Sequence, residues 1–106
     1  MREYTPDTWV VLEFTTPKTT FRKVFAGWYG GYTQGDSWKL NSGITVVTDY
    51  QHYYGFSGYS GSIYICNKNA YGMSGYMSNI LASWLKDAET AGIQIKIIEL
   101  ADIIQS

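Results

Sequence analysis

Apolar residues recur at helical spacing near the carboxyl end of the chain, and this segment is the clearest structural signal in the sequence. The repeating set, with polar residues opposite it, is Met77, Ile80, Leu81, Trp84, Leu85 and Ala88. Ser74 is a suitable N-cap, and Gly92 stands where a left-handed glycine would end the helix. A helix of about 16 residues is about 24 Å long and covers only one face of a sheet. The rest of the fold must therefore be arranged around a single helix.

The remaining segments have the composition of β-strands. Residues 8–15 and 20–29 are rich in β-branched and aromatic side chains, and Pro17 with Lys18 forms a turn between them. Further short strands are expected at 38–40, 44–48 and 62–66, and a last strand at 93–97. The order β-β-β-β-β-α-β predicts an α+β fold, with a single antiparallel sheet of five to six strands and one helix packed on one face. The length of 106 residues predicts one domain over 1–106.

Two details of this arrangement can be anticipated. Asn41-Ser42-Gly43 is expected to be a three-residue hairpin loop, because glycine accepts positive φ. The sheet face away from the helix must meet solvent, the tail or a partner. Packing on the domain is therefore expected for the apolar tail residues Leu100, Ile103 and Ile104, with a dimer contact as the alternative.

Residues 50–76 are the most unusual stretch of the chain. They contain seven Tyr and five Gly, and Lys68 is their only Lys, Arg, Asp or Glu. Tyr offers large amphipathic rings at low entropic cost and Gly permits irregular backbone, a combination favoured in protein-binding loops. Residues 27–38 have a similar composition. The predicted binding surface consists of Trp28, Tyr29, Tyr32, Tyr53, Tyr54, Phe56 and Tyr59. The alternative is a sheet whose solvent-facing side is covered by Tyr with its hydroxyls in water.

Charge and hydropathy bound the possible partners and compartments. Eight Lys and Arg against nine Asp and Glu give a formal charge of −1, which lacks the positive field that drives most nucleic-acid binding. No apolar run approaches the roughly 20 residues of a spanning helix, and the amino terminus has no signal-peptide core. The single cysteine, Cys66, cannot form an internal disulfide. The sequence predicts a cytoplasmic protein without membrane contact.

The sequence contains few of the residue patterns that are typical of catalytic, metal or cofactor sites. One histidine, His52, and one cysteine do not make a zinc site, and no phosphate-binding glycine loop is present. Cys66 lies in an apolar context and is expected to be an inert core thiol. No catalytic residue, cofactor or metal is therefore predicted. The remaining enzyme hypothesis is a small nuclease, with Glu13 or His52 as base and Arg22 beside the scissile phosphate.

Two motifs carry a resemblance. They are WKLNSGIT at 38–45 and YYGFSGYSGSIYICNKNAYGM at 53–73, about a third of the chain. The chain resembles small uncharacterised proteins of tailed phages that infect cyanobacteria. The resemblance implies expression in the cytoplasm of an infected cell, and it carries no activity and no catalytic residues.

The sequence thus predicts a phage accessory protein that acts by non-catalytic association with a protein partner through the Tyr-rich surface. Self-association into a homodimer is the nearest variant. The alternative is weak binding of single-stranded nucleic acid, in which the rings stack on bases and Arg22, Lys23 and Lys39 contact phosphates.

Overall fold

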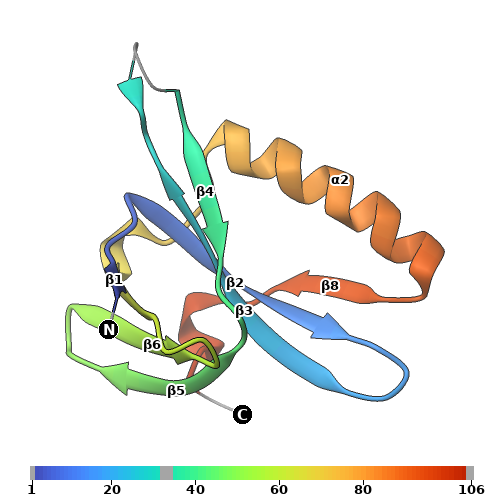
Figure 1. The fold of residues 1–106 in the computed structure, drawn as a ribbon, viewed down its shortest axis with the longest axis horizontal. Coiled ribbons are helices and arrows are strands. Elements are labelled where there is room, and N and C mark those ends of the chain that lie inside the picture. Colours follow the sequence, from blue (N-terminus) through green and yellow to red (C-terminus); the bar gives the residue numbers. More distant parts are fainter. Residues whose placement is uncertain (1, 32–34, 105–106) are drawn as a thin grey trace.

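The computed structural model describes residues 2–31 and 35–104, and it contains two four-stranded sheets and one long helix. One sheet has the order β1-β7-β6-β5, and the other has the order β4-β3-β2-β8. In Figure 1, α2 lies on one side of β2 and β3, and β5 and β6 lie on the other. The elements are β1 (Glu3–Tyr4), β2 (Thr8–Thr15), β3 (Thr20–Trp28), β4 (Ser37–Leu40), β5 (Ile44–Asp49), β6 (Tyr53–Gly58), β7 (Ile63–Asn67), α2 (Gly75–Ala91) and β8 (Gln94–Ile97), with 3-10 turns at Lys68–Ala70 and Leu100–Asp102.

The mixed α+β class is confirmed, whereas the prediction of a single sheet of five to six strands is wrong. The reason lies in β2, which is apolar on both faces. Val10 and Leu12 pack in the cluster beneath α2, while Trp9 and Val11 pack in a second cluster against the other sheet. A strand that buries both faces needs cover on both sides. One helix supplies one cover, and the β1-β7-β6-β5 sheet supplies the other.

The segment Asn41-Ser42-Gly43 joins the two sheets and is not a hairpin loop. β4 pairs with β3, and β5 pairs with β6, so the chain changes sheets at this point. Asn41 fastens the crossover to β3 twice: its N–H donates to the Val24 carbonyl at 3.0 Å, and the Val24 N–H donates to Asn41 Oδ1 at 2.8 Å. Gly43 follows with a φ of 127°, a conformation that favours glycine. The predicted need for positive φ is confirmed, but it serves a crossover.

Helix α2 agrees with the sequence prediction at both ends. Ser74 Oγ accepts a hydrogen bond from the Met77 N–H at 3.2 Å, and Gly92 ends the helix in the left-handed conformation with a φ of 74°. Most of the predicted inner side packs on the β4-β3-β2-β8 sheet, where Met77 and Leu81 join Phe25 in the buried cluster. Leu85, which the helical spacing also placed on this side, is 42% exposed. Within the described residues, no helix is both long enough and apolar enough to cross a membrane.

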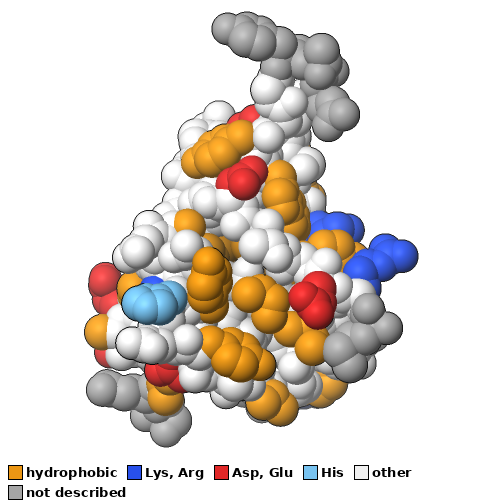
Figure 2. All heavy atoms as spheres, turned by 90° about the vertical axis from the view of Figure 1, so that its left-hand side faces the viewer, with side chains coloured by type: hydrophobic (Ala, Val, Ile, Leu, Met, Phe, Trp, Pro, Cys, Tyr) orange, Lys and Arg blue, Asp and Glu red, His pale blue; other side chains and the backbone are white. Residues whose placement is uncertain are grey.

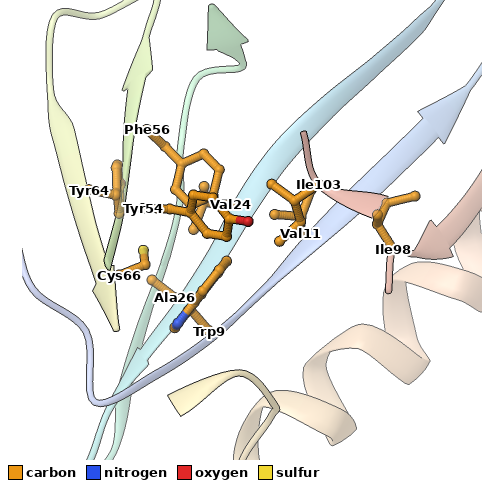
Figure 3. Close-up of a cluster of buried hydrophobic side chains, with 10 residues drawn as sticks. All are labelled: Trp9, Val11, Val24, Ala26, Tyr54, Phe56, Tyr64, Cys66, Ile98 and Ile103. Atoms are coloured by element: carbon orange, nitrogen blue, oxygen red, sulfur yellow. The ribbon is translucent and has the colours of Figure 1, made fainter. Parts of the chain in front are cut away.

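The inter-sheet core is rich in aromatic rings (Figure 3). Trp9 is fully buried, and its ring lies 5.4 Å from Phe56 and 4.6 Å from Tyr71, measured between centroids. The Tyr71 hydroxyl accepts from the Val11 N–H at 3.0 Å and donates to the Ile98 carbonyl. The cluster consists of Trp9, Val11, Val24, Ala26, Tyr54, Phe56, Tyr64, Cys66, Ile98 and Ile103.

The tail closes one end of this core. Ile103 is buried and Leu100 packs against the cluster, which confirms that the tail folds onto the domain. Ile104 differs, because 54% of its side chain is exposed. Leu100 and Ile103 are therefore covered by the domain itself, without a dimer contact.

Candidate functional site

The alternation of β6 divides the predicted aromatic surface into an inner and an outer part. Successive strand residues point to opposite faces, and Tyr54 and Phe56 point between the sheets, where they are 8% and 0% exposed. Their predicted place on a binding surface is wrong, because both side chains fill the core beside Trp9. Tyr53, which precedes them, points outward and is 39% exposed.

The predicted residues near the end of β3 lie apart from Tyr53. Trp28 is half-buried; its indole N–H donates to the Thr5 carbonyl at 3.0 Å, and its ring packs edge-on against Tyr4. Tyr29 is 59% exposed and is held through its backbone N–H, which donates to Asp7 Oδ2 at 2.8 Å. Tyr32 lies outside the described residues. Among the described residues, Trp28 and Tyr29 make these contacts with Tyr4, Thr5 and Asp7, and no aromatic pair joins either of them to Tyr53 or Tyr59.

Tyr59 lies beyond β6 and is 77% exposed. Its ring packs against Gly43, since a Cβ at that position would lie 2.8 Å from Tyr59 Cε2. Beside it a groove of about 460 Å³ opens between the sheets, with apolar walls that include Phe21 and Val47. Tyr59 therefore belongs to the rim of an inter-sheet groove.

Tyr53 belongs to a different surface, which we call the outer face: the solvent-facing side of the β1-β7-β6-β5 sheet. An irregularity in the β5–β6 register between Ile44 and Val46 leaves Val46 opposite Ser57, on the outward side. Figure 2 turns the side with β5 and β6 toward the viewer and shows hydrophobic side chains gathered over the lower half of the molecule, with few charged side chains among them. The apolar residues of the outer face are Val46, Tyr50, Tyr53, Ile63 and Ile65.

Tyr50 completes the outer face by folding back over β6. A Cβ at Gly55 would lie 2.8 Å from Tyr50 Cε2 and 3.7 Å from Ile65 Cδ1, so the Tyr50 ring rests on the glycine beside the isoleucine. The ring remains 59% exposed. Sequence reasoning missed Val46, Tyr50, Ile63 and Ile65. The period of two in residues 53–58 could have separated the outward Tyr53 from the inward Tyr54 and Phe56, but none of the four missed residues lies in that range.

One ion pair joins the last residue of β5 to the residue that follows β7, beside the inward-pointing Tyr54. Lys68 Nζ lies 2.7 Å from Asp49 Oδ1 and 4.4 Å from the centre of the Tyr54 ring. The hydrogen bond from Lys68 lowers the pKa of the Asp49 carboxyl, and the Gln51 N–H, which donates to the same oxygen, lowers it further. Asp49 and Lys68 thus neutralise each other at this end of the sheet.

The residues of the nuclease alternative do not converge. Glu13 and Arg22 form an ion pair at 3.0 Å, and Arg22 also donates to the carbonyls of Asp102 and Ile103 in the tail. His52 precedes β6, whereas the groove that contains the ion pair adjoins Tyr59, beyond the other end of that strand. Glu13 and Arg22 tie the tail to the sheet, and no base–histidine arrangement forms beside them.

The three cations of the nucleic-acid alternative do not form one track. Arg22 and Lys23 are neighbours in β3 and point to opposite faces of the sheet. Lys23 Nζ lies 5.8 Å from the centre of the Phe21 ring, whereas Lys39 Nζ lies 5.1 Å from the centre of the Tyr4 ring. Arg22 is engaged by Glu13. A phosphate backbone would have no continuous row of these three side chains to follow.

Cys66 is fully buried in the inter-sheet core, and burial raises the pKa of its thiol far above the ordinary value. A protonated, enclosed thiol is a poor nucleophile. Among residues 2–31 and 35–104, no group of three or more His, Cys, Asp or Glu side chains is arranged to hold a metal ion.

The structure brings the two sequence motifs of the resemblance into contact. The Ser60 N–H donates to Ser42 Oγ at 3.0 Å, and a Cβ at Gly58 would lie 2.8 Å from the same oxygen. These residues therefore hold the crossover against the β6–β7 turn. Comparison of the chain with protein-family models, curated proteins and solved structures finds no match. The site is interpreted from its own geometry.

Proposed function

We propose that the protein acts without catalysis, by binding another protein through the outer face. The observation that carries this proposal is the exposure of apolar side chains on a sheet that the helix does not cover: Val46 is 56% exposed and Tyr50 is 59% exposed. Contiguous exposed apolar residues mark interaction sites more often than isolated ones do. Glu3 of β1, opposite Ile63, places a charged side chain at the edge of the outer face.

The composition of the outer face suits a protein partner. Tyr is enriched at protein interfaces, and charged residues are depleted at the centres of such interfaces. The ring of Tyr50 already rests on Gly55, so little side-chain freedom remains to be lost on association. Glu3 lies at the margin of the outer face, where a polar rim is expected.

The resemblance to cyanophage proteins supports an accessory role in the cytoplasm of an infected cell, where the partner comes from the phage or from its host. A second copy of the chain is the nearest variant of this proposal. Light scattering at several protein concentrations separates the two cases, because only self-association makes the apparent mass rise with concentration.

Site-specific photocrosslinking tests the proposal directly. A photoreactive phenylalanine analogue is placed at position 46 on the outer face and, as a matched control, at position 85, where Leu85 is 42% exposed on the helix. We expect a discrete protein adduct from position 46 and none from position 85. Adding Tyr53→Ser to the position-46 protein should abolish the adduct. Identical adducts from both positions, or none from position 46, would contradict the proposal.

A further inference from the structure

A second groove lies where the strands β1 and β4 approach each other. It has a volume of about 440 Å³, and its lining includes Tyr4, Thr5, Trp28, Ser37 and Lys39. β1 is an end strand of one sheet and β4 is an end strand of the other, so the groove follows an open margin of the sandwich. The volume falls within the range of small-molecule sites.

Two cationic side chains lie close to Tyr4: Lys39, which lines the groove, and the exposed Arg2, which reaches the Tyr4 hydroxyl from outside the lining. Arg2 Nη1 donates to Tyr4 Oη at 3.4 Å, and Lys39 Nζ lies 5.1 Å from the centre of the Tyr4 ring. The hydrogen bond from Arg2 is the largest cause of a lowered pKa of the Tyr4 phenol, and the charge of Lys39 adds to it. Among the described residues, neither cation forms a salt bridge with a carboxylate. Positive charge is thus gathered around one hydroxyl without an acidic partner.

The carboxylate of Glu3 borders the same groove but belongs to the other side of the sheet. Tyr4 points between the sheets, where its ring centroid lies 5.0 Å from that of Tyr64 and 6.2 Å from that of Trp28. Successive strand residues point to opposite faces, so Glu3 points outward, opposite Ile63. The inner side of the groove therefore presents cations, hydroxyls and aromatic rings.

We propose that this groove binds a small phosphate monoester that carries an aromatic ring, with the phosphate held by Arg2, Lys39 and the Tyr4 hydroxyl. A phosphate monoester carries about 1.5 to 2 negative charges at neutral pH and accepts several strong hydrogen bonds. A guanidinium fork, an ammonium and a hydroxyl supply the matching donors. Trp28, which is half-buried and lines the groove, provides the aromatic surface on which the ring of the ligand packs. This site is separate from the outer face, so each proposal can fail without the other.

The test is an NMR titration of the whole protein with adenosine 5′-monophosphate as the probe, beside parallel titrations with adenosine and with inorganic phosphate. We expect amide shifts at Tyr4, Ser37 and Lys39, with affinity for the monophosphate at least about tenfold above that for either fragment. Lys39→Gln should weaken binding about threefold to tenfold, whereas Lys39→Arg should retain it. Lys86→Gln, an exposed lysine on α2, is the matched control and should leave the affinity unchanged.

Four results would overturn the proposal. Adenosine binding as tightly as the monophosphate would show that the cations hold no phosphate. Inorganic phosphate binding as tightly as the monophosphate would show that the aromatic ring of the ligand adds nothing to the affinity. An unchanged affinity in Lys39→Gln, with thermal melting that shows the variant to be folded, would place the ligand elsewhere, as would an absence of shifts in the groove.

Discussion

The two faces of β6 and β7 are built from similar residues and meet opposite environments. On the inner face, Tyr54 and Tyr64 are 8% and 4% exposed and pack in the inter-sheet core. On the outer face, Tyr53 and Tyr50 are 39% and 59% exposed. A Tyr-rich composition therefore locates a segment of interest, but the alternation of the strand decides which rings stabilise the fold and which are available to a partner.

The largest expected effect comes from removing an inner ring. Phe56→Ala should lower the free energy of unfolding by about 3 to 5 kcal/mol, because it leaves a cavity between the sheets. Tyr53→Ala, three residues away on the outer face, should cost about 1 kcal/mol or less. Urea unfolding monitored by circular dichroism measures both. Similar losses in the two variants would remove the distinction between inner and outer faces.

The crossover should show the next effect. Asn41→Ala leaves the buried Val24 N–H without the acceptor that lies 2.8 Å away, and a buried unpaired donor costs about 1 to 3 kcal/mol. Ser42→Ala is the neighbouring control, because Ser42 is exposed and accepts only from Ser60. Chemical unfolding should give a clearly lower free energy of unfolding for Asn41→Ala than for Ser42→Ala. The reverse order would mean that the crossover does not depend on the hydrogen bond between the Asn41 side chain and β3.

The buried Cys66 thiol on the inner face should make the free energy of unfolding decrease at alkaline pH. Burial raises the pKa of the Cys66 thiol in the folded state, so the folded protein keeps a proton that the unfolded chain loses. The resulting stability is present below the unfolded pKa and is lost as the pH rises above it, at up to about 1.4 kcal/mol per pH unit.

Unfolding experiments at pH 7.5, 9 and 10.5 measure this dependence, and Cys66→Ala should reduce the slope. Part of the slope should remain at the highest pH, because burial also raises the pKa of the Tyr64 and Tyr71 phenols. Equal slopes in the wild type and in Cys66→Ala would show that the thiol ionises as freely in the folded protein as in the unfolded one.

The smallest expected effect belongs to the outer face itself. Val46→Thr should change the free energy of unfolding by about 0.5 kcal/mol or less, since Val46 is exposed. Val47→Thr is its matched partner, because the next residue packs against the inter-sheet core and a hydroxyl placed there should cost about 1 to 3 kcal/mol. Thermal melting of the two variants compares adjacent residues on opposite faces. Two equally stable variants would mean that β5 does not separate an inner from an outer side.

Local features of the fold could be predicted from the sequence, because the relevant residues are close together in the chain. The helix and its caps at Ser74 and Gly92 are such features, and so is the strand at 8–15. β6 was missed, since Gly55 and Gly58 lower the strand propensity of a segment that tertiary contacts nevertheless hold extended. The Tyr and Gly content of this segment therefore predicts a binding loop, whereas residues 53–58 form a strand.

The division into two sheets depends on contacts that the sequence does not display. Asn41 has the side chain of a turn residue, and its bonds to β3 become visible only when β3 and β4 are already paired. The outer face depends on the same information. Whether Tyr53 or Tyr54 is exposed follows from the position of Trp9, which lies far away in the chain.

The pairing of β8 with β2 carries a consequence for synthesis of the chain. Ile95 and Ile97 of β8 lie opposite Phe14 and Leu12, so this edge of β2 has no partner until residues 94–97 have left the ribosome. The helix that covers the same sheet also comes late in the sequence. Early strands rich in β-branched and aromatic residues therefore emerge before the elements that shield them, and during synthesis they expose apolar surface and an unpaired strand edge, features that favour aggregation.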